Sequence, residues 1–90
     1  MAAYTVDARS RVRKALRQLD PTVRKDVLAK MRALATDPRP SGAEPLRGYS
    51  PWLRVRAGDY RIIYAVDDEA RVVTVASVGH RREVYRRLDL

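Results

Sequence analysis

Arginine is the residue type in this sequence best placed to do chemistry, because several arginines interrupt apolar segments. Arg54 and Arg56 lie in the run LRVRA, and Arg61 lies in the run YRIIYAV. Arg81 and Arg82 directly follow the last apolar run. Guanidinium groups bind phosphate through paired N–H donors and stabilise charge that builds on phosphorus during its substitution. These residues therefore predict a phosphate-binding surface, whereas the plainer alternative is a solvated sheet face whose cations prevent aggregation.

Two other side chains near this surface are able to move a proton. Tyr85 lies in the arginine-rich C-terminal segment, where its phenol either takes part in proton transfer or packs its ring on the sheet. His80 is the one histidine of the chain and is a secondary candidate for the same role. Arginine itself keeps its proton and makes a poor base.

The residues that are missing limit the kinds of reaction. The chain has no cysteine and one histidine, and it has no nucleophile-elbow motif, no phosphate-binding glycine loop and no clustered Asp or Glu for a metal ion. We therefore expect no metal and no cofactor. An enzyme of this composition works by positioning and electrostatics, so its nucleophile comes from the substrate. RNA offers a 2′-hydroxyl for this purpose, and DNA does not.

The charge balance indicates the kind of partner. Nineteen Lys and Arg against 11 Asp and Glu give a net charge of +8, which draws a small protein to nucleic acid or to an acidic protein. The 90 residues predict a single domain over 1–90. No apolar run approaches the ~18 residues of a membrane span, and the N-terminus lacks a secretory pattern. We expect a cytoplasmic protein that does not bind membranes.

The elements that position the arginines are three predicted strands, over residues 52–57, 60–66 and 72–80. Alternate side chains of a strand share a face. Leu53 and Val55 therefore point to one side, and Arg54 and Arg56 point to the other. By the same alternation Arg61 lies opposite its apolar neighbours, so the three arginines should gather on one face of the sheet.

Two helices precede these strands in the predicted order. Residues 3–6 form a short first strand, Asp7 caps a helix, and Asp20 with Pro21 begins a second helix. Apolar residues recur every three or four positions in both helices, which predicts a helical hairpin packed on the sheet. Residues 81–90 form a short terminal helix. The fold class is α+β, in the order β-α-α-β-β-β-α, with a small, mostly antiparallel four-stranded sheet.

Two blocks of the sequence, LRGYSPWLRVRAGDYRIIY and SVGHRREVY, resemble the RelE/ParE superfamily of bacterial toxins, and in particular its RelE-like branch. The resemblance extends over nearly the whole chain. It implies an active face built from Arg54 and Arg56 on the second strand and Arg61 on the third. Arg81 after the fourth strand and Tyr85 in the last helix complete the implied catalytic set.

The resemblance also implies a function. A RelE-like toxin of a type II toxin–antitoxin pair cuts mRNA in the ribosomal A site by attack of the 2′-hydroxyl, which inhibits translation. Its partners are the ribosome, mRNA and an acidic, amphipathic RelB-like antitoxin, and it reaches DNA only through that antitoxin. The implied RNA-binding residues lie on the arginine face and on the helical hairpin: Arg54, Arg56, Arg82, Arg13, Lys14, Arg17 and Lys25.

Two alternatives remain open at this level. Many relatives carry lysine at the second-strand positions, and a lysine can lose a proton and act as a base, whereas Arg54 and Arg56 cannot readily do so. The proton transfer then passes to Tyr85 or His80, or the chain is a catalytically weak homologue. The second alternative is a ParE-like inhibitor of DNA gyrase without nuclease activity, because both branches share one fold.

Overall fold

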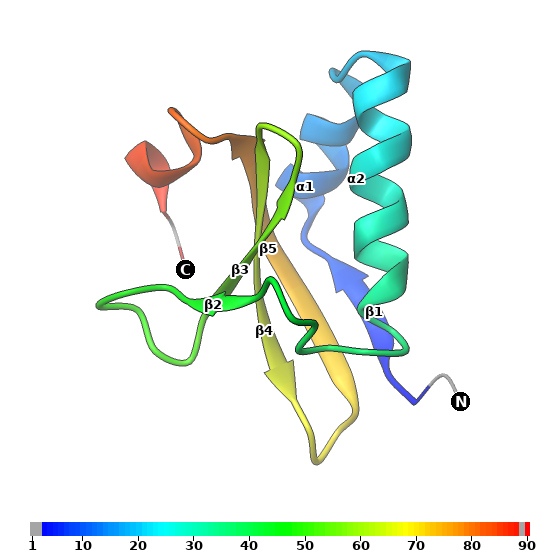
Figure 1. Cartoon of the computed structure of the whole chain (residues 1–90), viewed down its shortest axis with the longest axis vertical. Helices are drawn as coiled ribbons and strands as arrows, with labels where there is room; N and C mark the ends of the chain where they lie inside the picture. The colour runs from blue at the N-terminus through cyan, green and yellow to red at the C-terminus, as the bar shows by residue number, and fades with distance from the viewer. Residues whose placement is uncertain (1–2, 89) are drawn as a thin grey trace.

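A single sheet divides the molecule into two layers of unequal size (Figure 1). A computed structural model of the 90-residue chain describes residues 3–88 and 90, apart from the side chain of Arg87. The helices α1 (Ser10–Arg17) and α2 (Pro21–Ala33) lie on one side of the sheet. The C-terminal segment, with the 3-10 helix η1 (Val84–Arg87), lies on the other side. Within the described residues, no helix is long and apolar enough to cross a membrane.

The sheet has five strands in the order β1-β5-β4-β3-β2. Their bounds are β1 Thr5–Ala8, β2 Glu44–Pro45, β3 Leu53–Ala57, β4 Tyr60–Asp67 and β5 Val72–His80. β1 runs parallel to β5, and the other neighbours are antiparallel. The predicted α+β class and mostly antiparallel sheet are confirmed. The predicted count of four strands is wrong, because a fifth strand, β2, pairs with β3 at the edge of the sheet. Its two residues carry no local pattern that would predict a strand.

The hairpin of β3 and β4 sets the face on which the arginines lie. Arg56 pairs directly with Arg61, and Arg54 pairs with Ile63. Directly paired residues share a face, so the three arginines lie together on the side of the sheet away from the helices. The turn between the strands begins at Gly58, whose φ of 61° is a left-handed conformation that glycine adopts without a steric penalty.

The main core lies between the helices and the sheet. Apolar residues of α1 and α2 pack there against the inner faces of β3, β4 and β5: Val12, Leu16, Val27, Met31, Val55, Ile62, Tyr64, Val73 and Val75. Full burial of one aliphatic side chain of this size stabilises the fold by about 1.5–3 kcal/mol. Asp20 precedes Pro21 at the start of α2 as predicted, although its side chain makes no capping hydrogen bond.

The helical hairpin is closed by Arg24 of α2. Its Nε donates to the carbonyl of Leu16 at 2.9 Å, and its Nη2 donates to the carbonyls of Arg17 at 3.2 Å and Leu19 at 2.9 Å. The last carbonyls of a helix have no partner within the helix, so this guanidinium both satisfies the end of α1 and joins it to α2.

The N-terminal strand and helix begin later than predicted. Asp7 does not cap α1 but lies in β1, opposite Thr74 of β5, and Arg9 occupies the N-cap position. The free edge of β5 offers hydrogen bonds that hold the chain extended as far as Ala8. That partner is about 65 residues away in the sequence, so the local pattern does not reveal it.

A second, smaller core attaches the C-terminal segment to the outer face of the sheet. Leu46, Ile63 and Val84 are buried there, and Trp52 and Leu88 pack against them. The predicted terminal helix over 81–90 is the single 3-10 turn η1, and residue 89 lies outside the described residues. A Cβ on Gly79 would lie 3.3 Å from the Cβ of Val84, so glycine allows this segment to fold closely over β5.

Candidate active site

The arginines of the outer face line a groove of about 730 Å³, which we call the arginine groove. Its walls come from β2 and the loop after it, from β3 and β4, and from the segment that follows β5. Five arginines, one carboxylate and two tyrosines line it: Arg47, Arg54, Arg61, Arg81, Arg82, Glu44, Tyr49 and Tyr85. The structure thus brings four predicted site residues, together with Arg82, into one hollow.

Arg61 and Arg81 are both held at the turn between β3 and β4. Nη1 of Arg61 donates to the carbonyls of Gly58 and Tyr60, each at 3.1 Å. The backbone N–H of Arg81 donates to the carbonyl of Asp59 at 2.8 Å, and its Nε lies 3.7 Å from the Asp59 carboxylate. The turn therefore fixes the start of the segment after β5 beside the β4 arginine.

Glu44 is the acidic side chain that lines the groove. One of its oxygens lies 3.4 Å from Nη2 of Arg54, across the pairing of β2 with β3. The Glu44 side chain is 61% exposed, so this ion pair is worth at most about 1 kcal/mol. A carboxylate in this position both orients Arg54 and offers an acceptor for a proton inside a cationic groove.

The charge of the groove is strongly unbalanced. Five arginines face one carboxylate among the lining residues, and the pair of Arg81 with Asp59 is half exposed. Cations gathered in this way repel one another until an anion binds, and a phosphate oxygen accepts paired N–H donors from guanidinium. The groove is therefore suited to a phosphodiester.

Arg56 and His80 lie outside the groove, unlike the other predicted catalytic residues. Arg56 shares the outer face with Arg61 but is exposed and is not among the lining residues. His80 pairs with Tyr60 at the end of β5, and the two rings meet edge to face at 5.6 Å. Tyr60 packs against the main core, so His80 is directed away from the arginines. Its Nδ1 accepts the backbone N–H of Arg82 at 3.2 Å.

The predicted RNA-binding cations fall on two separate surfaces. Arg13, Lys14 and Arg17 are exposed on α1, and Lys25 is exposed on α2. The helices cover the opposite side of the sheet from the arginine groove (Figure 1). A polyanion on the helices and a strand in the groove would thus contact different sides of the molecule.

Sequence reasoning missed three residues that line the groove. Glu44, Arg47 and Tyr49 belong to a segment whose prolines and glycines predict only a loop. The block LRGY contains the one local signal, since an arginine and an aromatic residue directly precede the arginine-bearing strand. The ion pair of Glu44 with Arg54 depends on a two-residue strand at the sheet edge, which has no signature of its own.

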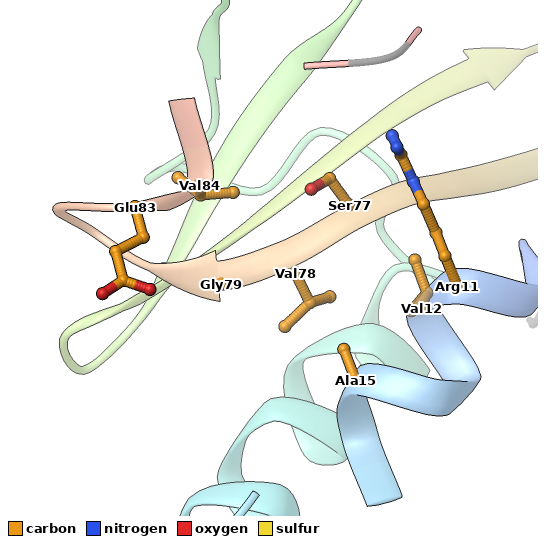
Figure 2. A pocket seen from close by; sticks show the side chains of 8 residues that line it. All are labelled: Arg11, Val12, Ala15, Ser77, Val78, Gly79, Glu83 and Val84. Atoms are coloured by element: carbon orange, nitrogen blue, oxygen red, sulfur yellow. The ribbon is translucent and has the colours of Figure 1, made fainter. Parts of the chain in front are cut away.

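A second hollow, of about 420 Å³, lies between α1 and the end of β5 (Figure 2). Its walls combine the apolar side chains of Val12, Val78 and Val84 with the polar side chains of Arg11 and Glu83. Nε of Arg11 donates to the carbonyl of Ala76 at 2.9 Å. This hollow lacks the convergence of cations that marks the arginine groove.

Residues 3–85 match the family described as ParE toxin of type II toxin–antitoxin system. The chain belongs to this toxin family. It is 39% identical over 87 residues to the mRNA interferase toxin RelE of Escherichia coli, with 92% of this chain and 90% of that protein covered. It is 32% identical over 85 residues to toxin RelG of Mycobacterium tuberculosis, with 93% and 98% covered.

Solved structures extend the likeness to the fold. The RelE–RelB complex of Pyrococcus horikoshii matches with a TM-score of 0.79 at 28% identity, covering 91% of this chain and 99% of that one. The intact RelBE toxin–antitoxin complex of Escherichia coli matches with a TM-score of 0.74 at 36% identity, covering 87% and 96%. The resemblance to the RelE/ParE superfamily is therefore confirmed.

Proposed function

We propose that this chain is the toxin of a type II pair and an endoribonuclease that cuts mRNA in the ribosomal A site. The observation that carries the proposal is the convergence of Arg54, Arg61 and Arg81 in one groove with Tyr85 and Glu44. Two similar proteins that are named mRNA interferase support the same activity. By arresting translation, the toxin would act in the cytoplasm.

The reaction needs one base, one acid and a cationic site for the phosphate. Arg61 and Arg81 bind the non-bridging oxygens and stabilise the charge that builds on them. The 2′-hydroxyl gives its proton to the Glu44 carboxylate, and the 2′-oxygen forms a bond to phosphorus. The P–O5′ bond breaks, and the leaving oxygen takes a proton from the Tyr85 phenol. The products are a 2′,3′-cyclic phosphate and a 5′-hydroxyl, and no step requires a metal ion.

Glu44 fits the role of base better than Arg54, Arg56 or His80, and it leaves Tyr85, the other candidate from the sequence, to act as the acid. Arg54 and Arg56 keep their protons and bind phosphate instead. His80 is directed toward Tyr60 and the main core, away from the groove. Glu44 lies in the groove and is oriented by Arg54 at 3.4 Å. This proposal replaces the lysine base of many relatives with a carboxylate from the neighbouring strand.

The exposed cations of the helical hairpin supply attachment to the ribosome in this proposal. Arg13, Lys14, Arg17 and Lys25 would contact RNA phosphates without reading the sequence, so the attachment should weaken with salt. Attachment through the helices leaves the groove on the opposite side free for the codon.

The proposed protein partner is an antitoxin of the RelB kind. Similar toxins have been solved as complexes with RelB antitoxins. A net charge of +8 favours an acidic partner, and an acidic segment over the five groove arginines would exclude mRNA. In such a pair the toxin reaches DNA only through its antitoxin.

Induced expression followed by mapping of mRNA 5′ ends tests the activity. We expect cuts in phase with codons in translated messages, with loss of cutting in Arg61→Ala and Arg81→Ala. Arg32→Ala is the matched control, because Arg32 is exposed on α2 and lies outside the groove. Intact messages together with inhibited gyrase supercoiling would reject the nuclease and favour the gyrase alternative.

The role of Glu44 needs a separate test on cleavage by toxin-loaded ribosomes. Glu44→Gln should lower the single-turnover rate by about 100- to 10,000-fold, the usual contribution of a general base. If Glu44 serves only to orient Arg54, Glu44→Gln would lower the rate no more than Arg54→Ala does, and adding it to Arg54→Ala would lower the rate no further.

A further inference from the structure

The arginine groove carries both of the large hydrophobic side chains that are exposed among the described residues. Tyr49 is 46% exposed and Tyr85 is 40% exposed, and both line the groove. A single exposed tyrosine on a small protein needs no explanation. Here two exposed tyrosines, one from the loop after β2 and one from η1, line the same cation-lined groove. This arrangement indicates a ligand that has both negative charge and aromatic faces.

The backbone of Tyr49 is held firmly although its ring is exposed. Its N–H donates to the carbonyl of Leu46 at 3.0 Å, and its carbonyl accepts the N–H of Trp52 at 2.8 Å. The N–H of Leu46 in turn donates to the carbonyl of Trp52 at 2.9 Å, which closes the loop. Leu46 and Trp52 both belong to the second core. Gly48, with a φ of 82°, makes the turn that presents Tyr49.

A fixed aromatic ring beside a cationic groove is the arrangement that binds single-stranded nucleic acid. Arginines hold the backbone, and aromatic rings stack on the bases that the backbone carries. A phosphate bound by Arg61 and Arg81 would carry its flanking nucleosides into the groove that Tyr49 and Tyr85 also line. Tyr85 lies on the segment after β5, and Tyr49 lies on the β2–β3 loop.

We propose that Tyr49 is a nucleobase-stacking residue, which binds the base on one side of the phosphate held by the groove arginines. This inference rests on the proposed function in one respect, namely that the substrate is a single RNA strand. Stacking accepts any base, because every base has an aromatic face. Tyr49 therefore positions the strand for cutting without selecting its sequence.

A strand that cannot be cut, with and without its bases, tests the proposal. The probe is a 12-nucleotide 2′-O-methyl oligouridine, either intact or as a fully abasic strand of the same length and charge, and binding is followed by fluorescence anisotropy. Tyr49→Ala should weaken binding of the intact strand by about 5- to 150-fold, the range for loss of one stacked base. Tyr49→Phe keeps the ring and should bind as the wild type does.

The decisive readout is the coupling between the Tyr49 ring and the bases. Tyr49→Ala should weaken binding of the intact strand and should leave binding of the fully abasic strand unchanged. The proposal is overturned if Tyr49→Ala binds the intact strand as tightly as wild type, if it weakens binding of the abasic strand equally, or if the wild type does not bind the intact strand. Codon-phased cutting tests the proposed nuclease in a separate experiment, so either conclusion can fail alone.

Discussion

The net charge of the arginine groove predicts how steeply RNA binding depends on salt. The groove has five arginines and Glu44, which leaves four uncompensated positive charges among its lining residues. Each phosphate neutralised on a single strand contributes about −0.7 to the slope of log affinity against log salt. Four contacts give a slope of about −2.8, so affinity should fall about 50-fold between about 50 and 200 mM salt.

Substitutions of opposite sign should move this slope in opposite directions. Arg61→Ala removes one positive charge, and the expected loss over the same salt range shrinks to about 18-fold. Glu44→Gln removes the one negative charge of the groove, and the expected loss grows to about 130-fold. An altered fold or non-specific binding would not change the salt slope in opposite directions in the two variants.

The assay is anisotropy of the labelled 2′-O-methyl oligouridine in potassium chloride, because that strand lacks the 2′-hydroxyl needed for cutting. The differences between variants are the quantities to compare, because any contribution to the slope that all variants share cancels. Arg32→Ala, exposed on α2 and outside the groove, should leave the wild-type slope unchanged. The assignment of the groove is refuted if Arg61→Ala keeps the full slope while Arg13→Ala reduces it, since the strand then lies on α1.

Three further predictions concern stability and are measured by urea unfolding. Burial raises the pKa of Tyr64 to about 12. The stability that the neutral Tyr64 phenol contributes is therefore complete below pH 10 and is lost as the pH rises toward 12. Tyr64→Phe should remove this loss of stability at alkaline pH. Hydrogen bonds from Arg39 and Tyr4 lower the pKa of Asp68 to about 2. The stability that the ionised Asp68 contributes is therefore present above about pH 4 and is lost as the pH falls toward 2. Asp68→Asn should abolish this dependence of stability on acidic pH. Arg24→Ala removes three hydrogen bonds to the end of α1 and the turn after it, and should lower the free energy of unfolding by about 2 kcal/mol, whereas Arg32→Ala should change it little.

Periodicity was sufficient to predict the elements that bury a regular face. The alternation in β3 and β4 correctly separates the core residues from Arg54, Arg56 and Arg61, and β5 has the predicted bounds. The same reasoning misplaced Asp7, because a parallel partner on β5 overrides its capping preference. Pairing between distant segments is not encoded in any local pattern, and it determined both ends of β1 as well as the existence of β2.

The residues of the arginine groove that lie on β3, on β4 and directly after β5 were expected from the sequence, whereas those of β2 and the loop after it were missed. Arg61 and Arg81 follow from strand alternation and from the position after β5, and both line the groove. His80 is adjacent to Arg81 in sequence, but it pairs with Tyr60 and lies on the face of the sheet opposite the groove. A step of one residue at the end of a strand moves a side chain to the other face. The proximity of residues in sequence is therefore a poor guide to which of them share a site.

The absence of a lysine base on β3 has a consequence for the role of the edge strand. If Arg54 and Arg56 only bind phosphate, the proton from the 2′-hydroxyl must go to another group within reach of the groove. β2 is two residues long, and its pairing with β3 contributes little to the fold. It does place Glu44 against Arg54 at 3.4 Å, as the one carboxylate among the residues that line the arginine groove. In the proposed mechanism, the edge strand is thus the element that supplies the base.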